Sequence, residues 1–199
     1  MFILFIIETM DDKYKKNKFL IILVLILSYG APASGINPDY LKNADKSICN
    51  QDDRLNIVLI VADDLGWTDL GFTGSDLHET PNLDQLAAEN MYFSNFYAAS
   101  PVCSPTRASI LTGKYPARLH ITTHYENSGD YWRNFSRDEK HPDQRLQQPT
   151  TVGNLPKSET TIAEFLKERG YFTAHIGKWH LGNFEHYPEN QGFDVNIGG

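Results

Sequence analysis

Cys103 lies four residues before Arg107 in the sequence SPVCSPTRASILTG. Ser104 is a favoured helix N-cap, Pro105 fits the first helical position and Gly113 can end a helix. We therefore expect a short helix whose N-terminus lies beside the cysteine. Free N–H groups and the helix dipole at such a point favour anions and thiolates, and Arg107 can direct its guanidinium there. The residues alone leave two interpretations open, a structural buried cysteine or a reactive, anion-binding centre.

Two adjacent carboxylates follow the first strong strand pattern. The run NIVLIVA, residues 56–62, predicts a strand buried on both faces, and Asp63 and Asp64 come directly after it. Ligands of open α/β sheets bind beyond the carboxyl ends of the strands, and paired carboxylates there suit a hard cation. The alternative is a turn in which both acids are solvated.

A second strand pattern ends in cationic residues. Thr161 and Glu164 form a capping-box pattern that predicts a helix ending at Gly170, and residues 171–176 then predict a strand. The sequence GKWHLG follows this strand and contains Lys178 and His180. By itself a Lys-x-His sequence at a strand end is most simply a loop. Its position predicts that it shares one edge of the sheet with the two carboxylates and the cysteine.

Together these segments resemble the type I sulfatases of the alkaline phosphatase superfamily. The matching motifs are C-x-P-x-R-A-S-x-L-T-G from Cys103, D-D-x-G-W-x-D-x-G from Asp63 and G-K-W-H-L-G from Gly177, and the segment QGFD at 191–194 is also similar. The resemblance implies an α/β fold. We expect the N-terminal portion of an alkaline-phosphatase-like sandwich, with a mainly parallel central sheet flanked by helices, incomplete in this chain.

The resemblance also implies a role for each motif residue. Cys103 is expected to be oxidised to formylglycine, whose hydrate attacks the sulfur of a sulfate ester and later releases sulfate through its second hydroxyl. Arg107 is expected to hold this nucleophile, Lys178 to contact the sulfate, and His180 to bond to the formylglycine hydroxyl. The expected reaction is hydrolysis of aryl or carbohydrate sulfate monoesters, in which a preorganised cluster of positive groups stabilises the sulfuryl oxygens.

The expected metal is calcium, with Asp63, Asp64 and the modified Cys103 among its ligands. Trp67 and Asp69, in the same motif, are expected to shape the loop. Family members are usually more than twice as long and supply further ligands from later parts of the chain. We therefore expect residues 55–199 to be the N-terminal part of the catalytic domain, and this chain to hydrolyse sulfate esters poorly or not at all.

The first 33 residues have the pattern of a secretory signal peptide. Four lysines precede the apolar run at 19–27, and the sequence Ala31-Pro32-Ala33 offers a cleavage site. Nine apolar residues are about half of a membrane span, although a short membrane anchor is the alternative. Residues 34–54 read as a linker. We expect entry into the secretory pathway, an extracellular, lysosomal or periplasmic location, contact with a formylglycine-generating enzyme during export, and no stable membrane span after cleavage.

Composition excludes one class of partner. The 199 residues are 41% hydrophobic with a formal net charge of −7, which suits a folded domain and lacks the basic surface of a nucleic-acid-binding protein. A sulfated small molecule or glycan is the expected ligand instead. The two cysteines, Cys49 and Cys103, do not form a disulfide framework, and we expect no bridge between them. Asn134 begins an N-glycosylation motif.

The remaining segments carry fewer signals. A helix is predicted from Pro81, with Thr80 as its cap, and a strand over 91–98. Residues 114–156 lack a sustained period and are predicted to be an extended surface excursion. Polar and aromatic residues in this excursion are candidates for substrate contacts, although each is more simply an ordinary surface residue: His120, His124, Tyr125, Trp132 and His141.

Two other functions fit the same residues. A phosphatase or phosphodiesterase of the same superfamily would share the strand-end aspartates, but would ordinarily present serine or threonine where Cys103 stands and use more metal ligands. A non-catalytic chain that at most binds sulfated ligands is the second alternative.

Overall fold

The computed structural model describes residues 19–25, 55–124, 143, 145–146 and 149–199. The chain divides into two compact units, Met1–Ala98 and Ala99–Gly199. The predicted linker, Cys49, Asn134 and the candidates Tyr125, Trp132 and His141 lie outside the described residues. Among those described, no helix combines the length and apolar character needed to cross a bilayer.

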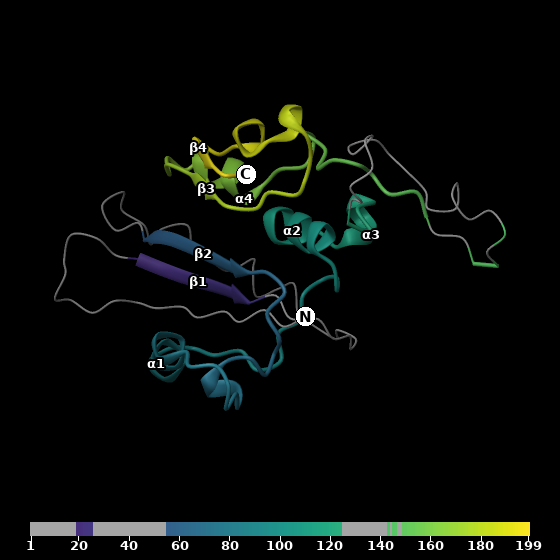
Figure 1. The fold of residues 1–199 in the computed structure, drawn as a ribbon. Coiled ribbons are helices and arrows are strands. Elements are labelled where there is room, and N and C mark those ends of the chain that lie inside the picture. Colours follow the sequence, from purple (N-terminus) through teal and green to yellow (C-terminus); the bar gives the residue numbers. More distant parts are fainter. Residues whose placement is uncertain (1–18, 26–54, 125–142, 144, 147–148) are drawn as a thin grey trace, which may run out of the picture. The chain divides into compact units, whose positions relative to one another are not determined.

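The first unit contains a two-stranded parallel sheet (Figure 1). Strand β1 (Phe19–Leu25) pairs with β2 (Asn56–Ala62), with Phe19 opposite Asn56 and Leu25 opposite Ala62. Strand β1 falls inside the predicted signal peptide, and its cleavage stays a prediction. Alternate side chains of β2 are exposed, Val58 by 38% and Ile60 by 47%. The expectation that β2 is buried on both faces is therefore wrong for this structure, because one face of the two-stranded sheet is open to solvent.

A loop and a helix complete the first unit. Leu70 is 2% exposed and packs against apolar residues of β2, of the short 3-10 helix η4 (Gly71–Thr73) and of helix α1 (Pro81–Glu89). Thr80 precedes α1 as predicted, although its hydroxyl accepts a hydrogen bond from the Gly71 N–H at 2.8 Å rather than from the helix. Asp84 accepts from the Phe72 N–H at 2.9 Å, so that the loop and the start of α1 are joined.

The strand predicted over 91–98 is absent from the structure, which has only an isolated bridge at Tyr97. The sequence Ser94-Asn95 forms a turn in the middle of this segment. Both residue types favour turns through side-chain hydrogen bonds to the backbone, and this preference overrides the aromatic and apolar pattern around them.

The second unit is built around helix α2 (Cys103–Thr112), followed by α3 (Pro116–Leu119) and α4 (Ile162–Lys167). Its core consists of Ala108, Leu119, Ile121, Leu155, Trp179 and Leu181, all at most 3% exposed. Ile121 and Leu155 belong to the segment predicted to be a surface excursion. That prediction is wrong for its two ends, which form α3 and part of the core.

The last part of the second unit is a small parallel sheet with two 3-10 helices. Strand β3 (Ala174–Ile176) pairs with β4 (Val195–Ile197), and η6 (Phe184–His186) and η7 (Pro188–Gln191) lie between them in the chain. The predicted strand 171–176 is shortened at its start. The Thr173 N–H donates to the Asp194 carboxylate at 2.9 Å, so a side chain occupies the position where a strand partner would bond.

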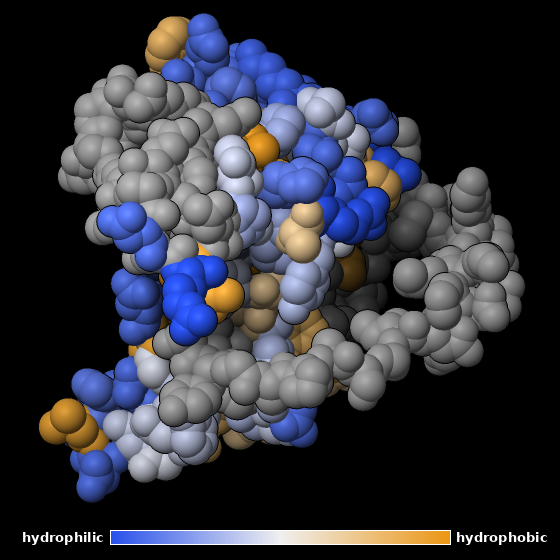
Figure 2. Space-filling model, turned by 90° about the vertical axis from the view of Figure 1, so that its right-hand side faces the viewer, coloured by the Kyte–Doolittle hydropathy of each residue, from blue (hydrophilic) through white to orange (hydrophobic). Residues whose placement is uncertain are grey.

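Figure 2 shows hydrophilic side chains over most of the described surface in that view, with hydrophobic side chains in small groups among them. The exposed hydrophobic residues include Ile176 (75%) and Ile197 (58%), which lie opposite each other in the β3–β4 register. Together with Val58 and Ile60 of β2, they show that each small sheet has an exposed apolar side.

Candidate functional site

Cys103 is the first residue of α2, and Val102 is the N-cap. The prediction that Ser104 caps the helix is wrong, because Ser104 is fully buried inside the first turn. Gly113 ends the helix in the left-handed conformation, with φ 67°, as predicted. Cys103 is a partly buried free thiol at the helix N-terminus, where N–H groups and the helix dipole favour negative charge.

Hydrogen bonds fix the residues that precede Cys103 in the chain. The Thr106 hydroxyl, which is fully buried, donates to the Ser100 carbonyl at 2.8 Å, and the Val102 N–H donates to the Ser100 hydroxyl at 3.3 Å. The start of α2 and the residues before it therefore form one bonded unit. The sequence analysis assigned no role to Thr106, and a threonine inside a helix carries no signal for this anchoring.

The thiol contacts a histidine from a distant part of the chain. The distance between Cys103 Sγ and His180 Nδ1 is 3.2 Å, within hydrogen-bonding range for sulfur. Either atom can donate, according to the tautomer of the imidazole. A thiol beside an imidazole can pass its proton to the ring, which is the usual way in which a cysteine nucleophile is activated.

Arg107 links the same two segments. Its Nη1 atom donates to the Lys178 carbonyl at 2.5 Å. Arg107 lies one helical turn after Cys103, so both side chains leave α2 on the same face. The structure thus brings together four residues that the sequence analysis selected: Cys103, Arg107, Lys178 and His180.

Strained backbone marks three residues that were selected from the sequence. Three non-glycine residues in the described ranges have positive φ: Asp64 (56°), His120 (54°) and His180 (58°). This conformation costs energy in residues with a Cβ atom and is often found at functional sites. For His120 a structural cause is evident, because it ends α3 and its carbonyl accepts from the Val152 N–H at 2.7 Å. His120 remains a candidate for substrate contact, for which an ordinary surface residue is the simpler interpretation.

The carboxylates lie at the carboxyl end of β2, as predicted. Asp63 is partly buried and Asp64 is exposed. Asp69 shapes the following loop, since its carboxylate accepts from the Gly66 N–H at 2.7 Å. Asp63 and Asp64 belong to the first unit and the cysteine to the second. No group of three His, Cys, Asp or Glu side chains able to hold a metal occurs within the described ranges.

Two histidines near the site have altered acidity. Burial lowers the pKa of His175, and the positive charge of Arg107 acts in the same direction. Burial also lowers the pKa of His186, with a further contribution from Lys157. Both imidazoles are therefore stabilised in the neutral form. His175 was not predicted from the sequence, because it lies outside every motif. Its place near the site is evident only from its packing.

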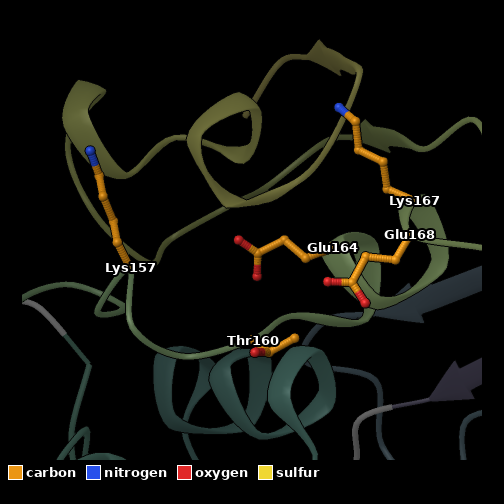
Figure 3. A pocket seen from close by; sticks show the side chains of 5 residues that line it. All are labelled: Lys157, Thr160, Glu164, Lys167 and Glu168. Carbon is orange, nitrogen blue, oxygen red and sulfur yellow. The ribbon is translucent and has the colours of Figure 1, made fainter.

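A separate depression of about 420 Å³ lies on the second unit, lined by Lys157, Thr160, Glu164, Lys167 and Glu168. Figure 3 shows the Glu164 carboxylate between the two lysines. Glu164 belongs to the capping box of α4, and Lys167 pairs with Asp194 at 2.5 Å. These charged groups support the fold, and the depression contains none of the predicted site residues.

A family profile described as Sulfatase matches residues 55–199. The chain is 44% identical over 146 residues to arylsulfatase G of Rattus norvegicus, covering 73% of this chain and 24% of that protein. It is 43% identical over 144 residues to N-acetylgalactosamine-6-sulfatase of Homo sapiens, covering 72% of this chain and 25% of that protein. The chain thus spans about a quarter of the length of these curated relatives.

The fold is similar to part of a solved structure. The crystal structure of Ps i-CgsB matches with a TM-score of 0.53 and 35% sequence identity, over 70% of this chain and 27% of that one. The mixed α/β arrangement with small parallel sheets is therefore shared with a larger protein.

Proposed function

The chain belongs to the sulfatase family, and on this basis we propose that it supplies the nucleophile end of an active site that hydrolyses sulfate monoesters. The observation that carries the proposal is the 3.2 Å contact between Cys103 Sγ and His180 Nδ1. Two motifs distant in sequence meet at this contact, and the hydrogen bond from Arg107 to Lys178 lies between the same segments.

In the proposed mechanism, position 103 provides the nucleophile. Formylglycine formed from Cys103 would supply, as its hydrate, an oxygen nucleophile and a second hydroxyl for release of sulfate. His180, in contact with the position 103 side chain, would hold or move the proton of that group. Arg107, one turn into α2, and Lys178 would attract the sulfuryl oxygens, so that binding requires little reorganisation.

The proposed cofactor is calcium. Asp63 and Asp64 offer hard oxygen donors at the end of β2, which is the donor chemistry that Ca²⁺ prefers. Calcium takes about six to eight oxygen ligands, so two carboxylates furnish only part of a shell. When bound, calcium would supply positive charge that stabilises the sulfuryl oxygens. We place the fold in the alkaline-phosphatase-like class. We propose that full activity requires a protein that supplies the remaining calcium ligands.

The proposed substrate is a sulfated small molecule or glycan, since one relative is an N-acetylgalactosamine-6-sulfatase and another an arylsulfatase. Entry into the secretory pathway and oxidation of Cys103 by a formylglycine-generating enzyme belong to the same proposal. The alternative, a phosphatase or phosphodiesterase, would ordinarily use serine or threonine at position 103. A comparison of the affinities for inorganic sulfate and inorganic phosphate distinguishes a sulfatase site from a phosphatase or phosphodiesterase site.

Titration of the purified chain with inorganic sulfate tests the proposal without turnover. NMR signals of Lys178 and His180 should shift with sulfate, and Lys178→Ala should weaken binding on the order of tenfold through loss of a charged hydrogen bond. Lys157→Ala, at an exposed lysine of the depression, is the matched control and should leave sulfate affinity unchanged. Equal affinities in the wild type and both variants, or a preference for phosphate, would contradict the proposal.

A further inference from the structure

His175 lies in the middle of β3, three residues before Lys178, and takes part in a cluster of three rings. Its ring centroid is 5.1 Å from that of Trp179 and 5.5 Å from that of Phe193, with interplanar angles of 85° and 70°. The rings of Trp179 and Phe193 are 6.0 Å apart at 85°. Each ring contacts the other two edge to face, which is the favoured geometry of aromatic pairs.

The cluster fixes the backbone that carries the site. Trp179 is 3% exposed and its Nε1 atom donates to the His186 carbonyl at 2.8 Å, so its ring has a defined position. Trp179 stands between Lys178 and His180 in sequence. A displacement of this ring that shifts the Trp179 backbone would also move the carbonyl that Arg107 binds and the residue whose imidazole contacts the thiol.

Charged and polar groups from three elements face His175. Arg107 approaches from α2, Glu189 from η7 and Asn196 from β4. Burial and then Arg107 favour the neutral imidazole, whereas a hydrogen bond with Asn196 and the charge of Glu189 oppose them, and the net result is a lowered pKa. Asn196 also donates to both Glu189 carboxylate oxygens at 3.1 Å, so these two residues are hydrogen-bonded to each other.

One ring nitrogen of His175 has no hydrogen bond of ordinary distance and angle. Nδ1 is buried and makes no hydrogen bond within the described part of the chain. Protonation would bury a positive charge and place it near Arg107, and these two effects together outweigh Asn196 and Glu189, which favour the charged form. Both effects favour a displaced ring when His175 is protonated.

We propose that His175 is a positioning residue: its neutral imidazole, packed against Trp179 and Phe193, holds residues 177–180 against Arg107 and Cys103, and its protonation releases that segment. Its importance for catalysis rests on the proposed sulfate-ester site. The positioning itself is a property of the chain and can be measured without substrate.

NMR titration of the full chain from pH 7.5 to 5 tests this inference. The backbone amides of Lys178 and Trp179 should show a transition at the midpoint measured for the ring of His175, whichever midpoint is measured for the ring of His180. His175→Phe keeps an aromatic ring but cannot titrate, and should abolish this transition. His78→Phe, at an exposed histidine of the first unit, is the control and should retain it.

Amides at 178–179 that follow only the His180 ring, or a transition that persists in His175→Phe, would overturn the inference. If circular dichroism shows that His175→Phe does not fold, the comparison of midpoints in the wild type decides the question. Loss of sulfate binding would count against the proposed function, but would leave the coupling between His175 and residues 177–180 untouched. The two failures are therefore distinguishable.

Discussion

The contact between Cys103 and His180 joins residues that are 77 positions apart in the sequence. Each belongs to a short motif, and the sequence analysis selected both, together with Arg107 and Lys178. Their proximity was predictable because strand ends and helix starts gather at one edge of an α/β sheet. The particular atoms were not predictable, since the Arg107 bond goes to a backbone carbonyl that no motif identifies.

The unmodified chain allows a test of the thiol–imidazole contact. Replacing His180 by glutamine should slow alkylation of Cys103 by iodoacetamide on the order of tenfold, because it removes the imidazole that contacts the thiol and can take up its proton. Peptide mapping by mass spectrometry measures the rate at Cys103 alone. His78→Gln is the control and should react as the wild type does. An unchanged rate in His180→Gln would show that the contact has no chemical consequence.

At the scale of elements, the sequence predicted helices better than strands. The capping box of Thr161 and Glu164 is present, with hydrogen bonds of 2.8 and 3.2 Å, because both partners are local. Helix α2 begins two residues earlier than predicted, because Ser104 is buried in the unit's interior and does not cap the helix. The start of β3 could not be predicted from local patterns, because it depends on the hydrogen bond from the Thr173 N–H to Asp194, which lies 21 positions away.

Gly192 lies between η7 and β4 in the chain and packs against the start of α4. Its substitution tests this packing. Its φ is 95°, and a Cβ atom there would lie 2.6 Å from the Glu164 nitrogen at the start of α4. Gly198 has a similar φ of 76° but open space around it. We expect Gly198→Ala to cost about 1 kcal/mol from backbone strain, and Gly192→Ala at least about 1 to 3 kcal/mol more from the clash.

Urea denaturation measures both glycine variants. Because Gly198→Ala carries the strain without the clash, the difference between the two free energies of unfolding isolates the contact with Glu164. Equal losses of stability would mean that residue 192 does not pack against α4 as the structure has it.

At the scale of the whole molecule, the described chain contains two small parallel sheets in two units, where the sequence predicted one larger sheet. The apolar run of β2 predicts burial on both faces, yet Val58 and Ile60 are exposed in the two-stranded sheet. The sequence of a strand indicates whether its faces must be buried, but it does not identify which segment of the chain buries them. The sulfatase profile and the shared fold confirm the α/β class.

The stability of the chain should depend on pH in a defined direction. The pKa values of His175 and His186 are lowered by burial, so folding favours their neutral forms. This stabilisation is complete above about pH 6.5, the usual histidine value, and is lost as the pH falls through the folded values. The pKa of Asp194, lowered by its hydrogen bonds with Lys167 and Thr173, adds a second loss below 3.8.

Chemical denaturation at a series of pH values measures this dependence. The free energy of unfolding should decrease between pH 7 and 5, and His175→Phe should decrease less over that range because one of the two histidines no longer titrates. A free energy that is constant over this range, or that increases on acidification, would contradict the buried neutral histidines.

The most direct test of the central claim is mass spectrometry of the peptide that carries position 103, after production in a host with the formylglycine-generating enzyme. A sulfatase site predicts the mass of the aldehyde at position 103, trapped by a hydrazine reagent, and its loss in Cys103→Ala. Pro105→Ala, which alters the motif beside the cysteine, should reduce the modified fraction. An unmodified thiol at position 103 in the wild-type chain would contradict the assignment.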